Sequence, residues 1–307
     1  MTTAPRTLPW IWSPAYEVDI GVHVYPTAKY RRIRDRLVAE GTLQETGFVA
    51  PSPAPRSALI VAHDAEWVDH VLGDGLTPHQ ERLLELPFTP QLRDAFLLCC
   101  GGTLAAGRLA LEHGISVHLG GGFHHAFRGH GEGFCLLNDV AVAAGALRAE
   151  GAAARVAVVD LDVHHGNGTA SIFQTDPDVF TFSMHQEWNY PARKPAGDLD
   201  VPLPDGTPDA AYLGLLETHL PAVIAHGPDL IIYLAGVDPF KEDQLGGLAL
   251  TSDGLRTRDR QVLEAAGRAG IPVAIVLAGG YARREADTVE LHCNTVREAA
   301  AALAAEP

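Results

Sequence analysis

The sequence predicts an α/β fold in which a single open, mostly parallel β-sheet carries helices on both faces. Short β-branched apolar runs alternate with longer helical patterns, and a strand–helix–strand order of this kind produces parallel strand pairs. Several predicted strands end in glycine, histidine, aspartate or tyrosine, and ligands bind beyond the carboxyl ends of the strands in such sheets. The chain has 307 residues, which we interpret as one domain spanning 1–307.

Composition narrows the function classes. A formal charge of −15 argues against a general nucleic-acid binder, which would carry a basic patch. We find no apolar run as long as a membrane span, and the N-terminus lacks the charged start and apolar core of a signal peptide. We therefore expect a cytoplasmic protein without a membrane partner. The four cysteines have neither metal-binding spacing nor a disulfide pattern.

The first part of the chain is expected to contain two helices and a strand. Tyr30–Glu40 has a helical pattern with arginines on its outer face, and Leu92–His113 is a long amphipathic stretch. Ala58–His63 is a candidate strand. Before the first helix, His23 and Tyr25 could line the rim of a pocket, or they could belong to an ordinary structured loop.

A strand over Ile115–Gly122 ends in three glycines and is followed by His124 and His125. Glycines let the backbone approach whatever occupies a site. One histidine here would more often be a satisfied core residue, but a tandem pair after three glycines favours a functional role. After a flexible loop that reads GHGEG, Asn138 is suited to cap the helix Asp139–Glu150.

The next strand, Val156–Val159, runs directly into Asp160, Asp162 and His164 within VVDLDVHHGNG. Side chains two apart in an extended chain share a face, so these three would point the same way. Two carboxylates and an imidazole at the end of a buried strand are costly to desolvate. A bound metal is the simplest explanation, and a solvated acidic loop is the alternative.

The remaining predicted elements continue the alternation. Two further buried strands precede Asp238 and Tyr281, which follow AGV and AGG respectively. The predicted elements are the strand Val179–His185, the edge strand Leu199–Leu203, the helix Ala210–His226, the strands Leu230–Gly236 and Ile271–Leu277, and a helix from Asp287.

These strand ends supply the parts of a hydrolytic site. Three ligands, Asp162, His164 and Asp238, would leave a divalent metal an open position, as in catalytic zinc sites, and oxygen-rich ligation would also accept iron(II). The metal would polarise a carbonyl and activate water. The other roles would fall to His124 and His125 as base and acid, Asp160 as the group that orients His124, and Tyr281 as a donor to the oxyanion.

The motifs GGGFHHA, GFCLLNDV, VVDLDVHHGNGT, SMH, AGVDP and AGGY stand in the order and spacing of the histone deacetylase family. The chain resembles that family from about Trp10 to Arg297, which implies the arginase–deacetylase fold. The opening HVYPTAKY, the segment NYPARK followed by GDLDV, and AGGYARREADTV are most similar to bacterial relatives of the class IV branch.

The resemblance implies zinc on Asp162, His164 and Asp238, an acid–base pair of His124 and His125, and carbonyl polarisation by Tyr281. It also implies a structural potassium ion on Asp160 and Ser183, with backbone carbonyls of Asp162, His164 and Met184. Gly133 and Phe134 would line an acyl-lysine tunnel, with the Gly133 carbonyl available to the substrate N–H. The residues expected to contact the substrate are Gly133, Phe134, His23, Tyr25, Tyr190 and Gly280.

Two positions depart from the class I pattern. Asn167 stands where class I members place an aspartate behind the second histidine, and it can orient His125 without adding negative charge, so the pKa of His125 should be lower. The loop Gln186–Gly197 lacks the segment that supplies the second tunnel aromatic. Trp188 or Tyr190 would have to substitute for it.

These observations predict a zinc-dependent amidohydrolase that removes acetyl or longer acyl groups from lysine side chains of peptides or proteins. The runner-up substrate is an acetylpolyamine or another small acylated amine. An arginase-like enzyme with two manganese ions and a non-catalytic acyl-lysine binder are the other candidates. A count of one metal per chain rather than two would separate the deacylase from the ureohydrolase. Natural substrate, acyl length, physiological metal and oligomeric state stay open at this point.

Overall fold

The computed structural model describes residues 7–73 and 75–305. Eight strands in this part of the chain form one sheet in the order β2-β1-β3-β8-β7-β4-β5-β6, and every neighbouring pair is parallel. The predicted fold class is confirmed, with a sheet that is wholly parallel over these strands. They are β1 (Trp10–Ile11), β2 (Phe48–Val49), β3 (Ile115–His118), β4 (Val156–Asp160), β5 (Val179–Gln186), β6 (Leu199–Leu203), β7 (Leu230–Leu234) and β8 (Val273–Val276).

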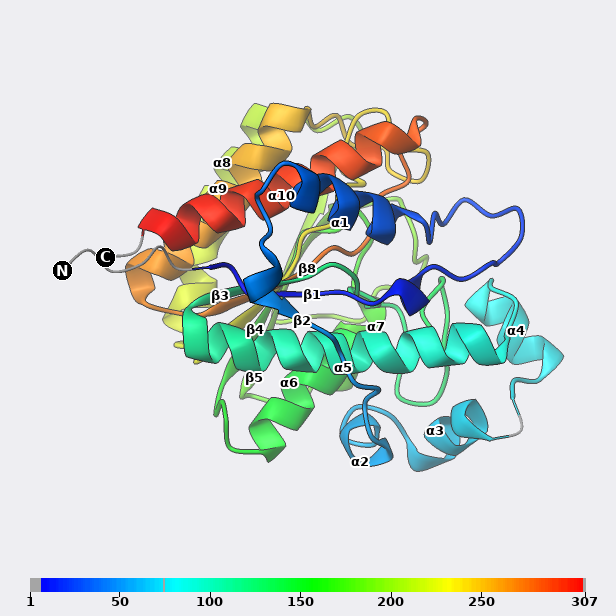
Figure 1. The fold of residues 1–307 in the computed structure, drawn as a ribbon. Coiled ribbons are helices and arrows are strands. Elements are labelled where there is room, and N and C mark those ends of the chain that lie inside the picture. The colour runs from blue at the N-terminus through cyan, green and yellow to red at the C-terminus, as the bar shows by residue number, and fades with distance from the viewer. Residues whose placement is uncertain (1–6, 74, 306–307) are drawn as a thin grey trace.

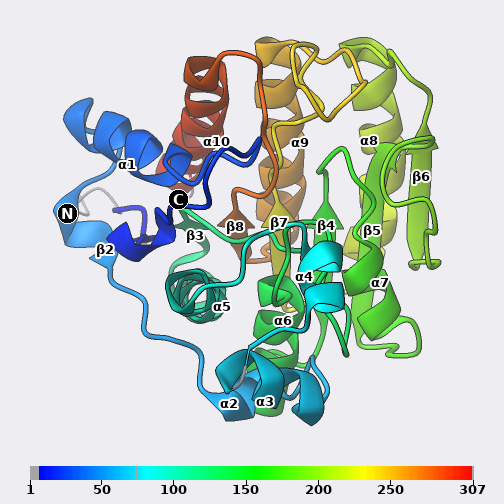
Figure 2. The same ribbon diagram turned by 90° about the vertical axis from the view of Figure 1, so that its right-hand side faces the viewer.

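Helices cover both faces of the sheet, as expected. In Figure 2, α1, α8, α9 and α10 lie above the sheet, and α5, α6 and α7 lie below it. The α-helices are α1 (Lys29–Ala39), α2 (Arg56–Leu59), α3 (Ala65–Leu72), α4 (Pro78–Leu84), α5 (Pro90–His113), α6 (Asp139–Ala149), α7 (Asn167–Phe173), α8 (Asp209–Ala225), α9 (Ser252–Ala269) and α10 (Glu285–Ala305). Short 3₁₀ turns occupy Pro14–Tyr16 and Glu45–Gly47.

The strand order brings the predicted site residues together. β3, β8, β7 and β4 are consecutive neighbours in the sheet, and their carboxyl ends lead to the histidine pair, Tyr281, Asp238 and Asp160 respectively. Every residue of these four strands is buried, because helices cover both faces of a parallel sheet. The polar groups that follow the strands therefore converge at one edge of a dry core.

The helix α5 runs across the lower face of the sheet (Figure 1) and packs against α6 and β3. It has 24 residues and is, among the described helices, the one that is long and apolar enough to cross a membrane. The sequence interpretation found no such run. In the structure 67% of its apolar window is buried, as in the core helix of a folded domain, so this helix is weak evidence for a membrane span.

The predicted strand Ala58–His63 is wrong. Residues Arg56–Leu59 form the short helix α2, preceded by Pro55 at its N-cap. A short apolar run does not distinguish strand from helix by periodicity, and proline favours the first turn of a helix. The sequence interpretation also assigned no helix to α3, α4 or α9. The helix α9 begins after Thr251, whose hydroxyl accepts a hydrogen bond from the Gly254 amide at 3.0 Å.

Candidate active site

Asp162, His164 and Asp238 meet beyond the ends of β4 and β7. All three are buried, and their potential ligand atoms lie within 4.8 Å of one another. Nδ1 of His164 lies 2.9 Å from Oδ1 of Asp162 and 3.3 Å from Oδ2 of Asp238. Backbone amides orient the carboxylates: Val163 donates to Oδ1 of Asp238 and Gly279 donates to Oδ2 of Asp162, each at 2.8 Å. The three side chains expected to hold a metal therefore converge.

The electrostatics of this cluster fit a bound cation. Oδ2 of Asp238 is buried and accepts no hydrogen bond from any described residue, although Nδ1 of His164 lies at ion-pair distance from it. Burial, together with the charge of Asp162, raises the pKa of Asp238 to about 7. Burial would lower the pKa of His164, but its interactions with the two carboxylates outweigh this and raise it to about 10. Two carboxylates buried together are costly without a compensating charge, and a divalent cation supplies it.

Glycine is required where the backbone passes this cluster. A Cβ at Gly236 would lie 2.6 Å from a carboxylate oxygen of Asp162, and one at Gly279 would collide with the carboxylates of both Asp162 and Asp238. The backbone just after β7 and in the turn after β8 can therefore approach the carboxylates closely. This explains the glycines of the AGVD and AGGY motifs.

His124 and His125 lie next to the cluster, with their Nε2 atoms 3.2 Å apart. Nδ1 of His124 is 2.6 Å from Oδ2 of Asp160, and Nδ1 of His125 is 2.7 Å from Oδ1 of Asn167. Burial would lower the pKa of His124, but the charges of Asp160 and Asp162 raise it to about 9. Burial and the neighbouring His124 hold the pKa of His125 well below its usual range. The two histidines therefore differ in charge: His124 is protonated and His125 is neutral.

The turn that carries the two histidines is held by Asp139, the first residue of α6. Its carboxylate accepts hydrogen bonds from the backbone amides of Gly122 at 3.0 Å and Phe123 at 2.7 Å, and from the hydroxyl of Thr103. Asn138 caps the same helix, as predicted, through a 2.9 Å bond from the Ala141 amide. The sequence interpretation read this segment as a helix start and missed the role of Asp139 in fixing the histidine turn.

Tyr281 reaches the site from the turn after β8. Its ring centroid lies 6.5 Å from that of His164, and burial raises the pKa of its phenol well above the usual value, so the phenol keeps its proton. Asp243 accepts a 2.6 Å bond from the Tyr281 amide, and the buried ammonium of Lys29 donates to the Ala278 carbonyl at 2.8 Å. Both groups were missed in the sequence, which offers no local signal for them.

Gly280 lies inside the same turn. A Cβ there would lie 2.5 Å from Cγ2 of Val237, so the residue faces the protein interior. A small inner chamber of the site is lined by its two neighbours, Gly279 and Tyr281. The contact of Gly280 with a substrate stays a prediction.

A cavity of about 180 Å³ leads to the cluster. Its walls include His125, Gly133, Phe134, His164, Tyr190 and Tyr281. The Tyr190 ring centroid is 4.8 Å from that of His125, whereas Trp188 is 81% exposed. Of the two aromatics that the sequence offered for the second wall, Tyr190 is the one at the site.

Phe134 forms another part of the cavity wall and adopts a positive φ of 67°. The amides of Gly133 and Phe134 donate to the Leu83 and Leu84 carbonyls at the end of α4, at 3.1 and 2.9 Å. A Cβ at Gly133 would lie 2.9 Å from Cδ2 of His125 and equally close to the Tyr190 ring, so glycine is required between these two side chains. A short helix that the sequence interpretation missed therefore positions this wall.

His23 and Tyr25 lie behind Phe134. The His23 ring meets the Phe134 ring edge-on at 4.8 Å, and the Tyr25 ring stacks on it at 6.3 Å with an interplanar angle of 6°. Tyr25 is buried, and its hydroxyl lies 2.9 Å from that of Tyr30. It lines an inner chamber of about 30 Å³ that also touches His124. Of the two, Tyr25 reaches the site and His23 supports its wall.

Glu132 joins Asn167 to the cavity wall. Its Oε1 accepts hydrogen bonds from Nδ2 of Asn167 at 2.6 Å and from the hydroxyl of Tyr190 at 2.9 Å. Burial would raise its pKa, but these bonds and one to His130 lower it. The carboxylate is therefore ionised one side chain behind His125. In the sequence it stands in a glycine-rich loop, and only the fold brings it to Asn167.

A buried ion pair on α9 supports the loops that carry Asp162 and Asp238. Arg258 and Asp259 are fully buried, and the guanidinium donates to the carbonyl oxygens of Gly236 at 2.5 Å and Leu161 at 3.2 Å. The hydroxyl of Tyr233 donates to Asp259 at 2.5 Å. Arg258 thus holds the two loops that present Asp162 and Asp238. The sequence offered no signal for this role, because α9 itself was not predicted.

Asp160 and Ser183, expected at a potassium site, are direct partners in the β4–β5 register. Ser183 Oγ lies 3.0 Å from Nδ1 of His185, and Met184 is buried in the same strand. Asp160 and Ser183 are therefore neighbours in the sheet, and the potassium site stays a prediction.

Comparison with known proteins identifies the family. Residues 23–296 match the histone deacetylase domain. The chain is 43% identical to an uncharacterized protein of Picosynechococcus sp. over 92% of this chain and 95% of that protein. It is 30% identical to histone deacetylase 2 of Arabidopsis thaliana over 91% of this chain and 77% of that one. It is also 30% identical to a histone deacetylase-like amidohydrolase of Pseudomonas aeruginosa, over 90% and 76%.

The fold agrees with these matches. The crystal structure of the HDA15 HD domain superposes with a TM-score of 0.76 at 25% identity, covering 96% of this chain and 89% of that one. The family match spans the strands that carry the aspartates, the histidine pair and Tyr281. With its parallel sheet and this set of side chains, the chain belongs to the histone deacetylase family.

Proposed function

We propose that this protein is a zinc-dependent deacetylase that removes acetyl groups from lysine side chains of peptides or proteins, and that it works in the cytoplasm as a bacterial class IV-type enzyme. The observation that carries the proposal is the convergence of Asp162, His164 and Asp238 beside a protonated and a neutral histidine, at the base of an aromatic-walled cavity. The family match supports the deacetylase chemistry.

Asp162, His164 and Asp238 would hold the zinc ion, which supplies a polarised carbonyl and a water of lowered pKa. Neutral His125 is suited to take the proton from the attacking water, because Asn167 orients its ring through Nδ1. The proton can then pass to the leaving amine. His124 keeps its own proton against Asp160 and stabilises the negative charge that develops.

Tyr281 supplies the remaining interaction. Its phenol is protonated and can donate a hydrogen bond to the oxyanion that forms from the substrate carbonyl. Phe134 and Tyr190 line the cavity with aromatic rings, which suit the methylene stem of a lysine side chain and exclude water around it. The carbonyl of Gly133, which now lies 3.4 Å from the thiol of Cys135, is available to the substrate N–H.

The size of the inner chamber favours a short acyl group. At about 30 Å³, it has room for one or two water-sized groups, enough for an acetyl methyl. Tyr25 and Tyr30 bound it, and both are buried and hydrogen-bonded to each other. We therefore expect acetyl to be preferred to longer acyl chains.

A small acylated amine such as an acetylpolyamine is the runner-up substrate, because the same catalytic groups would serve it. An arginase-like binuclear centre is less well supported. Among the described residues, the potential metal ligands gathered at this edge of the sheet are Asp162, His164 and Asp238. The carboxylate of Asp160 is hydrogen-bonded to His124 instead. A non-catalytic acyl-lysine binder would be expected to lack one of the catalytic groups.

The decisive assay measures turnover of lysine peptides that carry acetyl through long fatty acyl groups, together with acetylpolyamines and arginine. Each substrate is tested on enzyme treated with a chelator and on enzyme resupplied with zinc. We expect zinc to restore activity, and acetyl-lysine peptides to be the best substrates. Chelator-resistant activity would refute the zinc assignment, and activity on arginine alone would favour a ureohydrolase.

A further inference from the structure

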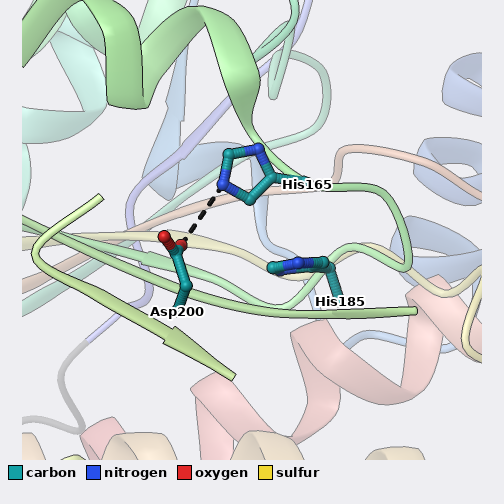
Figure 3. Close-up of side chains that lie close together, drawn as sticks. All are labelled: His165, His185 and Asp200. Carbon is teal, nitrogen blue, oxygen red and sulfur yellow. Dashed lines mark hydrogen bonds and ion pairs between the residues drawn. The ribbon is translucent and has the colours of Figure 1, made fainter. Parts of the chain in front are cut away.

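A second group of potential metal ligands lies at the edge of the sheet, apart from the active-site cluster. It consists of His165, from the loop after β4, His185 in β5 and Asp200 in β6, with one donor atom of each within 4.8 Å of the others. Figure 3 shows the His165 ring directed toward Asp200, with His185 beside them on the neighbouring strand. Both histidines are buried, and the Asp200 side chain is 27% exposed.

The spacing of these donors suits a tetrahedral metal ion. Nε2 of His165 lies 3.2 Å from Oδ1 of Asp200. Two ligands bound at about 2.0–2.1 Å to a tetrahedral zinc ion lie about 3.3 Å apart. The nitrogen and the oxygen are therefore already separated as two ligands of one ion would be. The partial exposure of Asp200 gives an ion a route to the site from solvent.

Neighbouring groups orient the donors as they do around bound metals. Nδ1 of His185 lies 3.0 Å from the Ser183 hydroxyl, which leaves Nε2 of His185 as the nitrogen without that contact. A ligating histidine commonly bonds a neighbouring group through its other ring nitrogen in this way. The Gly197 amide donates to Oδ2 of Asp200 at 2.8 Å, so Oδ1 is the oxygen left for a ligand.

The imidazole of His165 has one polar contact among the described residues, and it is within the cluster. Its Nε2 faces Asp200, whereas its buried Nδ1 points away and has no hydrogen-bond partner among the described residues. Lys194, the cation that influences His185, donates instead to the carbonyls of Asn189 and Pro191, each at 2.7 Å. Its ammonium is thus engaged outside the cluster.

We propose that His165, His185 and Asp200 form a second site for a divalent transition cation such as Zn²⁺, with the fourth position open to water. Two imidazoles and one carboxylate form a common three-ligand set for zinc. An ion there would tie the loop that bears His164 to β5 and to the edge strand β6. Its role would be to hold that loop in place, which goes beyond the deacetylase activity proposed above.

The test counts zinc per chain. The protein is stripped with a chelator, given excess Zn²⁺, freed of unbound ion by gel filtration, and analysed by mass spectrometry of the metal. Asp200→Asn preserves the shape of the side chain while it removes the charged ligand, and His185→Gln removes a second ligand. Asp238→Asn reports on the active site. His63→Gln is the matched control, because His63 is a buried, hydrogen-bonded imidazole outside both clusters.

We expect two zinc ions in the wild type and the His63 variant, one in each single-ligand variant, and none in Asp200→Asn combined with Asp238→Asn. Added Zn²⁺ should raise the Tm of Asp238→Asn but not that of the double variant, which reports binding independently of activity. The inference would be overturned if the wild type bound a single ion that is kept in Asp200→Asn and lost in Asp238→Asn, and the deacetylase proposal would then stand. A single ion lost in Asp200→Asn and kept in Asp238→Asn would support the second site and refute the zinc site of the proposed deacetylase. Loss of both ions in Asp238→Asn alone would overturn the inference and indicate a binuclear centre.

Discussion

Asn167 donates a hydrogen bond from Nδ2 to Oε1 of Glu132, with a separation of 2.6 Å. Because Oδ1 of the same amide lies 2.7 Å from Nδ1 of His125, an ionised carboxylate is coupled to the histidine through one neutral side chain. The carboxylate also polarises the amide and makes its oxygen a better acceptor. Asn167 thus orients His125, and the negative charge of Glu132 lies behind Asn167 rather than in contact with the histidine.

Replacing Asn167 with aspartate should raise the pKa of His125, because a carboxylate in direct contact stabilises the imidazolium. His125 must be neutral to accept a proton, so the acidic limb of the kcat/KM profile should move to higher pH by about one unit. The new charge would also stand beside Glu132. The double variant Asn167→Asp, Glu132→Gln removes that repulsion and should shift the limb at least as far. An unmoved limb would mean that His125 is not the base.

Glu132→Gln should separate the charge of this side chain from its hydrogen bonds. Glutamine can still accept from Asn167 and Tyr190, so KM should stay close to wild type while kcat falls by roughly tenfold, the value of about 1.5 kcal/mol for a bond to a charged group. Glu132→Ala also releases the Tyr190 hydroxyl, and KM should then rise as well. Equal kinetic constants in the two variants would show that the charge has no separate effect.

Asp162→Ala or Asp238→Ala should abolish turnover by removing one of the three ligands of the active-site metal. The measurements are deacetylase activity and zinc content on the same preparation. Asp253→Ala, an exposed carboxylate in the first turn of α9, serves as the control and should retain both. Wild-type zinc content at the active site in either ligand variant would contradict the ligand assignment.

Tyr281→Phe should lower kcat by about 10²–10³, the usual cost of one oxyanion donor. The ring and its packing are kept, so the protein should stay folded and loaded with metal. Acetylated peptide should bind with near-native affinity, because the lost interaction forms mainly in the transition state. If turnover is undiminished, another group polarises the carbonyl, and Tyr25 is the first to test.

Arg258→Met should destabilise the protein by about 3–5 kcal/mol, because it leaves the buried carboxylate of Asp259 without its partner. The backbone carbonyls of Gly236 and Leu161 also lose their donor, so zinc retention should fall with stability. Urea unfolding measures the first effect and metal analysis the second. Arg268→Met on the same helix removes an ion pair to Glu264 in which the arginine is 71% exposed, and it should change stability by no more than about 1 kcal/mol.

The sequence by itself determined the fold class and the chemistry of the strand ends. Val156–Asp160 and the residues that follow it show why. A fully buried parallel strand leaves a continuous apolar run, and polar residues directly after such a run stand out against it. The same reasoning identified Asp238 and Tyr281. It failed at Ala58–His63, where the apolar run is too short for its period to distinguish a strand from a helix.

Only the tertiary structure decided which distant side chains support that chemistry. Glu132 and Asn167 are hydrogen-bonded although 35 positions separate them in the chain. Lys29 donates to the Ala278 carbonyl over a separation of 249 positions. Arg258 donates to the Leu161 carbonyl, just before Asp162, over a separation of 97 positions. Such contacts depend on strand order and on how helices pack over the sheet, and neither leaves a local pattern. The choice of Tyr190 over Trp188 has the same origin, because two aromatics in one loop differ only in the direction that the folded loop gives them.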